Sequence, residues 1–117
     1  MERQSLYKKD EMLCLNILDA CKKIDYISKM FNSHEEFERN PISFDASLMN
    51  FIVIGEMANK LSIDFRNQNP GIEWVKIISF RNFVAHDYFG IDAEEVWEII
   101  KEDIPGLLKA ISHLIPQ

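Results

Sequence analysis

The chain has 117 residues, of which 47% are hydrophobic, and a formal net charge of −6 at pH 7. This length and composition predict one domain, residues 1–117, that can bury a packed core, and they exclude a disordered chain. The acidic balance argues against broad, nonspecific nucleic-acid binding, which needs a basic face, but it leaves room for a small basic cleft.

The cysteines and the apolar runs indicate the compartment. Cys14 and Cys21 lie about 10 Å apart along one helix by its rise per residue, which is too far for a disulfide. They are therefore interpreted as reduced core thiols of a cytoplasmic protein. No signal peptide is apparent, and no apolar stretch approaches the length of a membrane span.

A seven-residue apolar repeat predicts a first helix from about Glu2 to Phe31. Its seam includes Leu6, Leu13, Ala20 and Ile27. A polar stretch follows, with a short turn of helix expected around residues 35–38. A second helix is expected to open near residues 43–45 and to run to about residue 65.

The third helix should begin near Ile72 or Glu73 and stop at Gly90. Asp92 is expected to cap a fourth helix, and Pro105-Gly106 should kink or break it, with Asp103 able to cap the last segment. These elements predict an all-α, up-and-down bundle of four or five helices.

The third helix carries the most informative segment, Arg81-Asn82-Phe83-Val84-Ala85-His86-Asp87-Tyr88. Helical spacing places Arg81 in the middle of the apolar face of the helix and His86 to one side of that face. Tyr88, seven residues after Arg81, projects in the same direction as Arg81. An unpaired buried guanidinium is costly, so Arg81 should meet an acid, a backbone carbonyl or a phosphate. Because this helix is apolar around most of its circumference, we also expect it to form the interface of a homodimer.

Two acids are candidate partners of Arg81. Asp10 occupies an apolar position of the first seam; it either lies solvated near a frayed helix end, which is slightly favoured, or faces a cation such as Arg81. Gly55 costs the second helix about 1 kcal/mol relative to alanine, which close approach of another backbone would explain. Glu56 follows it and is either solvated or bound to Arg81.

The residues present narrow the chemistry. His34, His86 and His113 lie on different elements and give no metal-ligand spacing, and there is neither a hydrolytic triad nor a Gly-rich phosphate loop. A cation and an imidazole suit metal-free cleavage of RNA, whose 2′-hydroxyl supplies the nucleophile. Arg81 could clamp the phosphate. From composition alone, a structural ion pair and a half-buried ring are the more frequent roles for such residues.

The order Arg81, four residues, His86, one residue, Tyr88 resembles the Arg-x4-His-x-Tyr motif of the HepT-like family of HEPN-domain ribonuclease toxins. The resemblance covers nearly the whole chain. Besides the motif and the long first helix, it includes Ile54-Gly55-Glu56, Pro70 to Trp74, Tyr88-Phe89-Gly90-Ile91-Asp92 and Val96-Trp97.

This resemblance implies a HEPN-like homodimer whose motif helices face each other across a cleft at the two-fold axis. Arg81 and His86 would carry a metal-independent endoribonuclease chemistry without a cofactor, and Asn82 would help to shape the site. The family acts in type II or type VII toxin–antitoxin pairs with a minimal nucleotidyltransferase, the MntA-like antitoxin. That partner would attach AMP to Tyr88 and silence the nuclease.

Two other classes of function fit the same residues. One is a noncatalytic module that docks a minimal nucleotidyltransferase and binds nucleotide in the cleft, and the other is a purely structural dimerising bundle. Cleavage of RNA that depends on His86 separates the enzyme from both.

Overall fold

The computed structural model describes the backbone of residues 2–115 and the side chains of residues 8–115. Within this range the chain forms seven α-helices and one 3-10 helix, with no strand, which confirms the all-α prediction. The elements are α1 (Glu2–Ser28), α2 (His34–Glu38), α3 (Pro41–Lys60), α4 (Ile63–Gln68), α5 (Trp74–Asp87), η1 (Tyr88–Gly90), α6 (Ala93–Glu102) and α7 (Ile104–Leu114).

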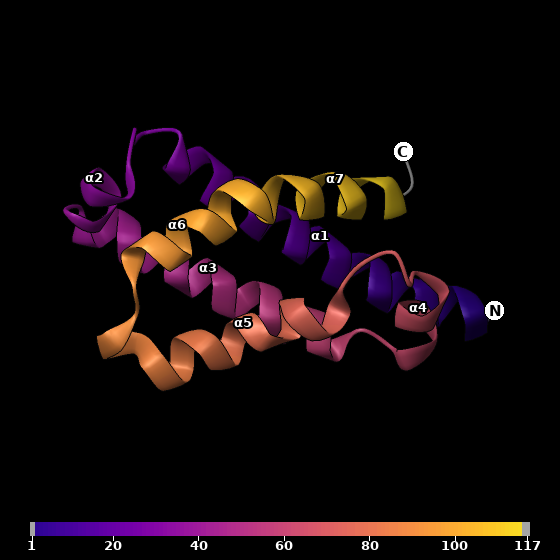
Figure 1. Cartoon of the computed structure of the whole chain (residues 1–117). Coiled ribbons are helices and arrows are strands. Elements are labelled where there is room, and N and C mark those ends of the chain that lie inside the picture. The colour runs from indigo at the N-terminus through magenta and orange to yellow at the C-terminus, as the bar shows by residue number, and fades with distance from the viewer. Residues whose placement is uncertain (1, 116–117) are drawn as a thin grey trace.

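Four long segments run alternately up and down the long axis of the molecule, as predicted (Figure 1). α1 and α5 run in one direction, whereas α3 and the α6–α7 pair run in the other. α3 lies at the centre and packs extensively on both α1 and α5, and α7 packs on α1. α5 therefore lies at an edge of the bundle, with α3 as its main neighbour.

The predicted seam of α1 forms much of the core. Leu13 and Ala20 are buried and Ile27 is partly buried, while the side chain of Leu6 lies outside the described residues. α1 ends at Ser28 rather than Phe31, because the chain turns there to bring Phe37 inward. Phe37 is fully buried in a group of aromatic rings with Phe31, Phe44 and Trp97.

The second predicted helix is split in the structure. α3 ends at Lys60, Leu61 is extended, and Ser62 caps the short α4 by accepting a hydrogen bond from the backbone N–H of Phe65 at 3.1 Å. Apolar residues continue across this break, so their pattern alone predicted one helix through residue 65. The break positions Ser62 opposite α1.

Asp10 contacts Ser62 at this break, and the two expectations for it, a solvated carboxylate or a partner of Arg81, are both wrong. Its two carboxylate oxygens accept hydrogen bonds from the backbone N–H of Ser62 at 3.0 Å and from the Ser62 hydroxyl at 2.9 Å. The residue is only 3% exposed, so it is neither solvated nor facing Arg81. Burial of this carboxylate is tolerated because two donors satisfy it.

The last two helices begin differently. Asp92 caps α6 as predicted, by accepting a hydrogen bond from the backbone N–H of Glu94 at 3.0 Å. α7 begins at Ile104, immediately before Pro105, but Asp103 makes no side-chain cap there. Its carboxylate instead pairs with Lys76 of α5 at 3.1 Å, which corrects the predicted capping role and joins α5 to the α6–α7 connection.

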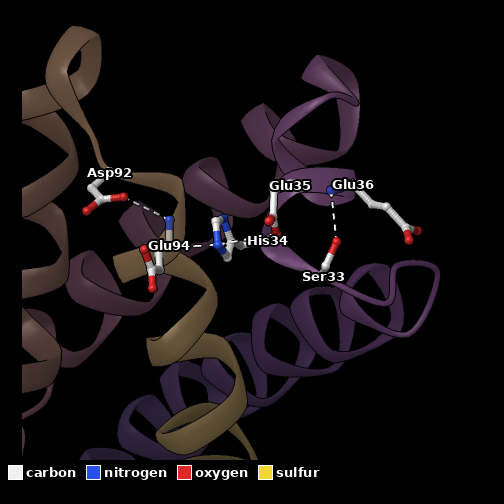
Figure 2. Close-up of polar contacts among 6 residues, drawn as sticks. All are labelled: Ser33, His34, Glu35, Glu36, Asp92 and Glu94. Atoms are coloured by element: carbon white, nitrogen blue, oxygen red, sulfur yellow. Dashed lines mark hydrogen bonds and ion pairs between the residues drawn. The ribbon is translucent and has the colours of Figure 1, made fainter.

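His34 lies at the junction of α2 and α6, close to the start of α6. Figure 2 shows its imidazole between two glutamates, with Nε2 3.3 Å from Glu35 and 4.0 Å from Glu94. Ser33 caps α2 beside it by accepting a hydrogen bond from the backbone N–H of Glu36. The contact with Glu94 links α2 to the start of α6, directly after the segment that joins η1 to α6.

Cys14 and Cys21 are free, buried thiols. Burial raises the pKa of Cys14 to about 11, with the charges of Asp10 and Glu11 adding to the shift, and burial raises the pKa of Cys21 to about 12. Among the described helices, none combines the length and the apolar character that a membrane crossing requires.

Candidate functional site

The motif helix, α5, has one buried side and one open side. Trp74, Ile77, Phe80 and Val84 are buried, and the Trp74 indole N–H donates to the carbonyl of Asn69 at 3.0 Å to fix the start of the helix. The exposed side carries a stripe at helical spacing, formed by Val75, Ser79, Asn82 and His86. The helix is therefore less apolar around its circumference than the sequence suggested, and the open stripe is mainly polar.

Gly55 lets the backbones of α3 and α5 approach closely, as its position in the sequence suggested. A Cβ atom at Gly55 would lie 2.9 Å from both the Cβ and the backbone nitrogen of Arg81, and 3.1 Å from the carbonyl oxygen of Ile78. The atoms it would meet are backbone atoms and a Cβ, which cannot rotate away. Glycine at this position therefore sets the place of Arg81 against α3.

Glu56, the next residue, forms an ion pair with Arg81. The Arg81 Nη1 atom lies 2.9 Å from Glu56 Oε1, and the two side chains are about two-fifths exposed. A partly exposed pair of this kind contributes only about 0–1 kcal/mol to stability. Its main effect is on orientation, since it fixes one edge of a planar guanidinium whose remaining N–H groups can bind a phosphate.

Asn82 and His86 lie on the exposed stripe rather than beside Glu56. His86 is in the last turn of α5, and its imidazole is open to solvent. An exposed imidazole can take a proton from a bound molecule or give one to it. The structure thus presents an oriented cation and an exposed imidazole within two turns of one helix.

Tyr88 follows the α-helical part of the motif. α5 ends at Asp87 and Tyr88 begins η1, so the expectation of one continuous α-helix through Tyr88 is wrong by a single residue. The side chain is nevertheless directed at α3, like that of Arg81. The ring is 45% exposed, and its hydroxyl donates a hydrogen bond to Asp45 Oδ1 at 3.0 Å.

Asp45 was not identified from the sequence, although it contacts a motif residue. Its hydrogen bond raises the pKa of the Tyr88 phenol, and the carboxylate charge and slight burial add to this shift. Asp45 and Glu56 are eleven residues apart on α3, about three helical turns, so they share one face. That spacing is a sequence signal, but it becomes informative only once α3 and α5 are known to be antiparallel neighbours.

A cleft at the opposite end of α5 does not include the motif. It has a volume of about 230 Å³ and lies between α7 and the first half of α5, with Ile77, Phe80 and Leu107 in its apolar wall. Lys76 lines this cleft and pairs with Asp103 rather than with a motif residue. The motif residues instead lie on an open surface.

Metal binding has no obvious location in the described part of the chain. Across residues 8–115, no three His, Cys, Asp or Glu side chains gather closely enough to hold a metal ion. The candidate nuclease groups are the Arg81 cation, which Glu56 orients, and the His86 imidazole, while Tyr88 and its partner Asp45 lie beside them.

Comparisons with known proteins identify one family. The family model described as HepT-like, Ribonuclease HepT-like, matches residues 17–114, a range that includes α5 and η1. No solved structure matches the chain significantly.

Curated relatives come from archaea and bacteria. The chain is 32% identical over 96 residues to "Putative RNase MJ1380" of Methanocaldococcus jannaschii, covering 82% of this chain and 81% of that protein. It is 33% identical over 110 residues to MJ0127 of the same organism, named in the same way, covering 92% and 89%. It is 38% identical over 55 residues to "Probable ribonuclease HepT" of Thermococcus cleftensis, covering 47% and 50%. The chain belongs to the HepT-like ribonuclease family.

Proposed function

We propose that this protein is the toxin component of a toxin–antitoxin pair and that it cleaves RNA with Arg81 and His86. The observation that supports this proposal most directly is the Arg81–Glu56 pair, which holds a guanidinium in one orientation while leaving it about two-fifths exposed. The exposed part of the guanidinium can bind a phosphate while Glu56 keeps it in place. Membership of a ribonuclease family supplies the class of substrate.

The proposed reaction uses the 2′-hydroxyl of RNA as nucleophile. Its oxygen attacks the adjacent phosphorus, the bond from phosphorus to the 5′-oxygen breaks, and the products carry a 2′,3′-cyclic phosphate and a 5′-hydroxyl. His86 accepts the proton of the 2′-hydroxyl or gives a proton to the leaving oxygen. Arg81 binds the phosphate and stabilises the charge that grows on it, and Asn82 contributes a polar contact from the same exposed stripe. No step requires a metal ion.

A homodimer would complete this site. α5 lies at the edge of the bundle, and its exposed stripe brings Asn82 and His86 to an open surface rather than into a cleft. A second copy packed across this stripe would create walls and would place an imidazole from each protomer near one scissile bond. We expect a dimer with α5 at the interface, which light scattering at micromolar concentration measures; a stable monomer contradicts it.

The proposed control acts through Tyr88. A minimal nucleotidyltransferase of the MntA-like class transfers AMP to the phenol oxygen, which lies at the surface. The added phosphate would bring negative charge and bulk close to Arg81 and so exclude RNA from the same cation. Tyr88→Phe would keep the ring but remove the acceptor oxygen, and this variant should escape neutralisation.

The decisive experiment compares RNA cleavage by the parent, Arg81→Ala and His86→Ala, with EDTA present throughout. His113→Ala is a matched control, because His113 is an exposed histidine on α7, away from the motif. We expect each motif variant to lose at least about 100-fold in rate, because His86→Ala removes the acid–base group and Arg81→Ala removes the cation that stabilises the developing charge, while the control remains active. Full activity of His86→Ala contradicts the assignment, and nucleotide binding without cleavage by any variant supports the docking module instead.

A further inference from the structure

We propose that Asp45 is the group that holds the Tyr88 phenol for AMP transfer and accepts its proton during that reaction. The inference rests on the proposed function, in which Tyr88 is the AMP acceptor. It gives a second residue of α3, after Glu56, a role beside the Arg81–Tyr88 segment.

The geometry places one carboxylate oxygen on the reacting hydroxyl. Asp45 lies in the second turn of α3 and Tyr88 at the start of η1, and the 3.0 Å bond joins residues 43 apart in sequence. Both side chains are exposed, so the bond forms at a surface that a partner enzyme can reach. The hydrogen bond fixes the direction of the phenol O–H and therefore the direction of the lone pairs that would attack.

Neighbouring acids are less suitable for this role. Glu56, on the same face of α3, is already bound to Arg81. Asp45 Oδ1 accepts a hydrogen bond from the Tyr88 hydroxyl. Among the described residues, no cation forms an ion pair with this carboxylate. Its capacity to accept a proton is therefore not offset by a fixed positive partner.

The chemistry requires such a proton acceptor. A tyrosine phenol is protonated at neutral pH, so its proton has to leave while the oxygen reacts, and the hydrogen bond to Asp45 raises its pKa further. In the step proposed, the Tyr88 oxygen forms a bond to the α-phosphorus of ATP. The bond from that phosphorus to the bridging oxygen breaks, pyrophosphate leaves, and the phenol proton passes to Asp45 and then to solvent.

The first test measures AMP transfer by intact mass over time, using the purified chain, its cognate minimal nucleotidyltransferase and Mg-ATP. Asp45→Asn keeps a carbonyl oxygen that can accept the hydroxyl but cannot take its proton, and Asp45→Ala removes both. We expect kcat for transfer to fall by roughly 100-fold in both variants, with little change in KM for ATP. Asp64→Asn, an exposed aspartate on α4, is the matched control and should be modified at the parental rate.

The second test needs no partner. Absorbance titration of the phenolate, taken as the difference between each protein and its Tyr88→Phe counterpart, should show a lower Tyr88 pKa in Asp45→Asn than in the parent. RNA cleavage by unmodified Asp45→Asn should match that of the parent, because Asp45 is not part of the proposed nuclease chemistry.

The outcomes separate the two proposals. Modification of Asp45→Asn at the parental rate, or an unchanged Tyr88 titration, overturns the role of Asp45 while the acceptor role of Tyr88 stands. A parent chain that gains no AMP at Tyr88 overturns both. RNA cleavage that depends on His86 stands or fails independently of these results.

Discussion

Two aspartates in this bundle accept hydrogen bonds from distant hydroxyl groups, but their surroundings differ. Asp10 is 3% exposed, and both of its oxygens are bound to Ser62, where α3 gives way to α4. Asp45 is exposed, and the hydrogen bond that it accepts joins α3 to Tyr88 at the end of the motif. The bond type is the same, so the difference in solvent access should decide what each carboxylate does.

The buried contact should carry fold stability, because removing one partner leaves desolvated donors without an acceptor. The exposed contact costs little to break, since water can replace it, and it remains accessible to a reacting partner. Three substitutions compare the buried contact of α1 with the start of α4 and the more open contact of α3 with α5. They are ordered by their expected effect on the free energy of unfolding.

Asp10→Ala should produce the largest loss. The Ser62 N–H and hydroxyl lose a charged acceptor, and hydrogen bonds to charged groups contribute about 1.5–3 kcal/mol, so we expect the free energy of unfolding to fall by about 2–3 kcal/mol. Urea titration measures this change. Asp19→Ala is the control, because Asp19 makes only an exposed pair with Lys23. A loss below about 0.5 kcal/mol, the range of ordinary surface substitutions, would show that burial of Asp10 matters little.

Gly55→Ala should have an intermediate effect on the free energy of unfolding, and it should also displace the motif residue Arg81. The new methyl group would meet Arg81 backbone atoms, and overpacking of this kind costs about 1–3 kcal/mol, partly offset by about 1 kcal/mol of helix propensity. We expect a net loss of about 1 kcal/mol and slower RNA cleavage, because Arg81 is displaced.

Gly106→Ala is the matched control for this substitution. Gly106 also lies in a helix, but a methyl group there meets nothing within 4 Å, so it should stabilise the protein by about 0.5–1 kcal/mol. If thermal or urea unfolding shows that both alanines stabilise equally, the close contact of α3 with α5 does not constrain the fold.

Glu56→Gln should have the smallest effect on unfolding, within about 1 kcal/mol, because the Arg81 pair is partly exposed. RNA cleavage should still fall by about tenfold, since the guanidinium loses the anion that orients it and a tenfold change corresponds to about 1.4 kcal/mol. Glu98→Gln, an exposed glutamate on α6, serves as control. An increase in cleavage would mean that Glu56 competes with RNA for Arg81 rather than orienting it.

Helical periodicity was sufficient to predict the bundle, because each long helix buries one apolar stripe. The glycine at position 55 predicted the close approach of another backbone, since glycine is unfavourable inside a helix, and the structure shows that this backbone belongs to α5. The break after Lys60 was not predictable in the same way, because Leu61 and Phe65 continue the apolar pattern through it. The partner of Asp10 depends on that break, so its role was missed.

Several contacts between segments distant in sequence could not be predicted from helical periodicity. Asp45 is an ordinary surface acid by composition and hydropathy, and only the antiparallel packing of α3 against α5 and η1 brings it to Tyr88. The burial of Phe37 was missed because it also depends on distant segments. This residue is a single apolar residue in a polar stretch, and a cluster of rings from other segments buries it completely.

The reactivity of the two buried cysteines reports on transient opening of the bundle. A thiol with a pKa of about 11 is ionised in roughly one molecule in a thousand at pH 8, and the Cys14 and Cys21 side chains are at most 1% exposed. Alkylation of either sulfur therefore requires that α1 separate from the helices that cover it. The alkylation rate of the native protein therefore measures how often these separations occur. The measurement needs no engineered label and applies to the parent and to every variant that keeps both cysteines.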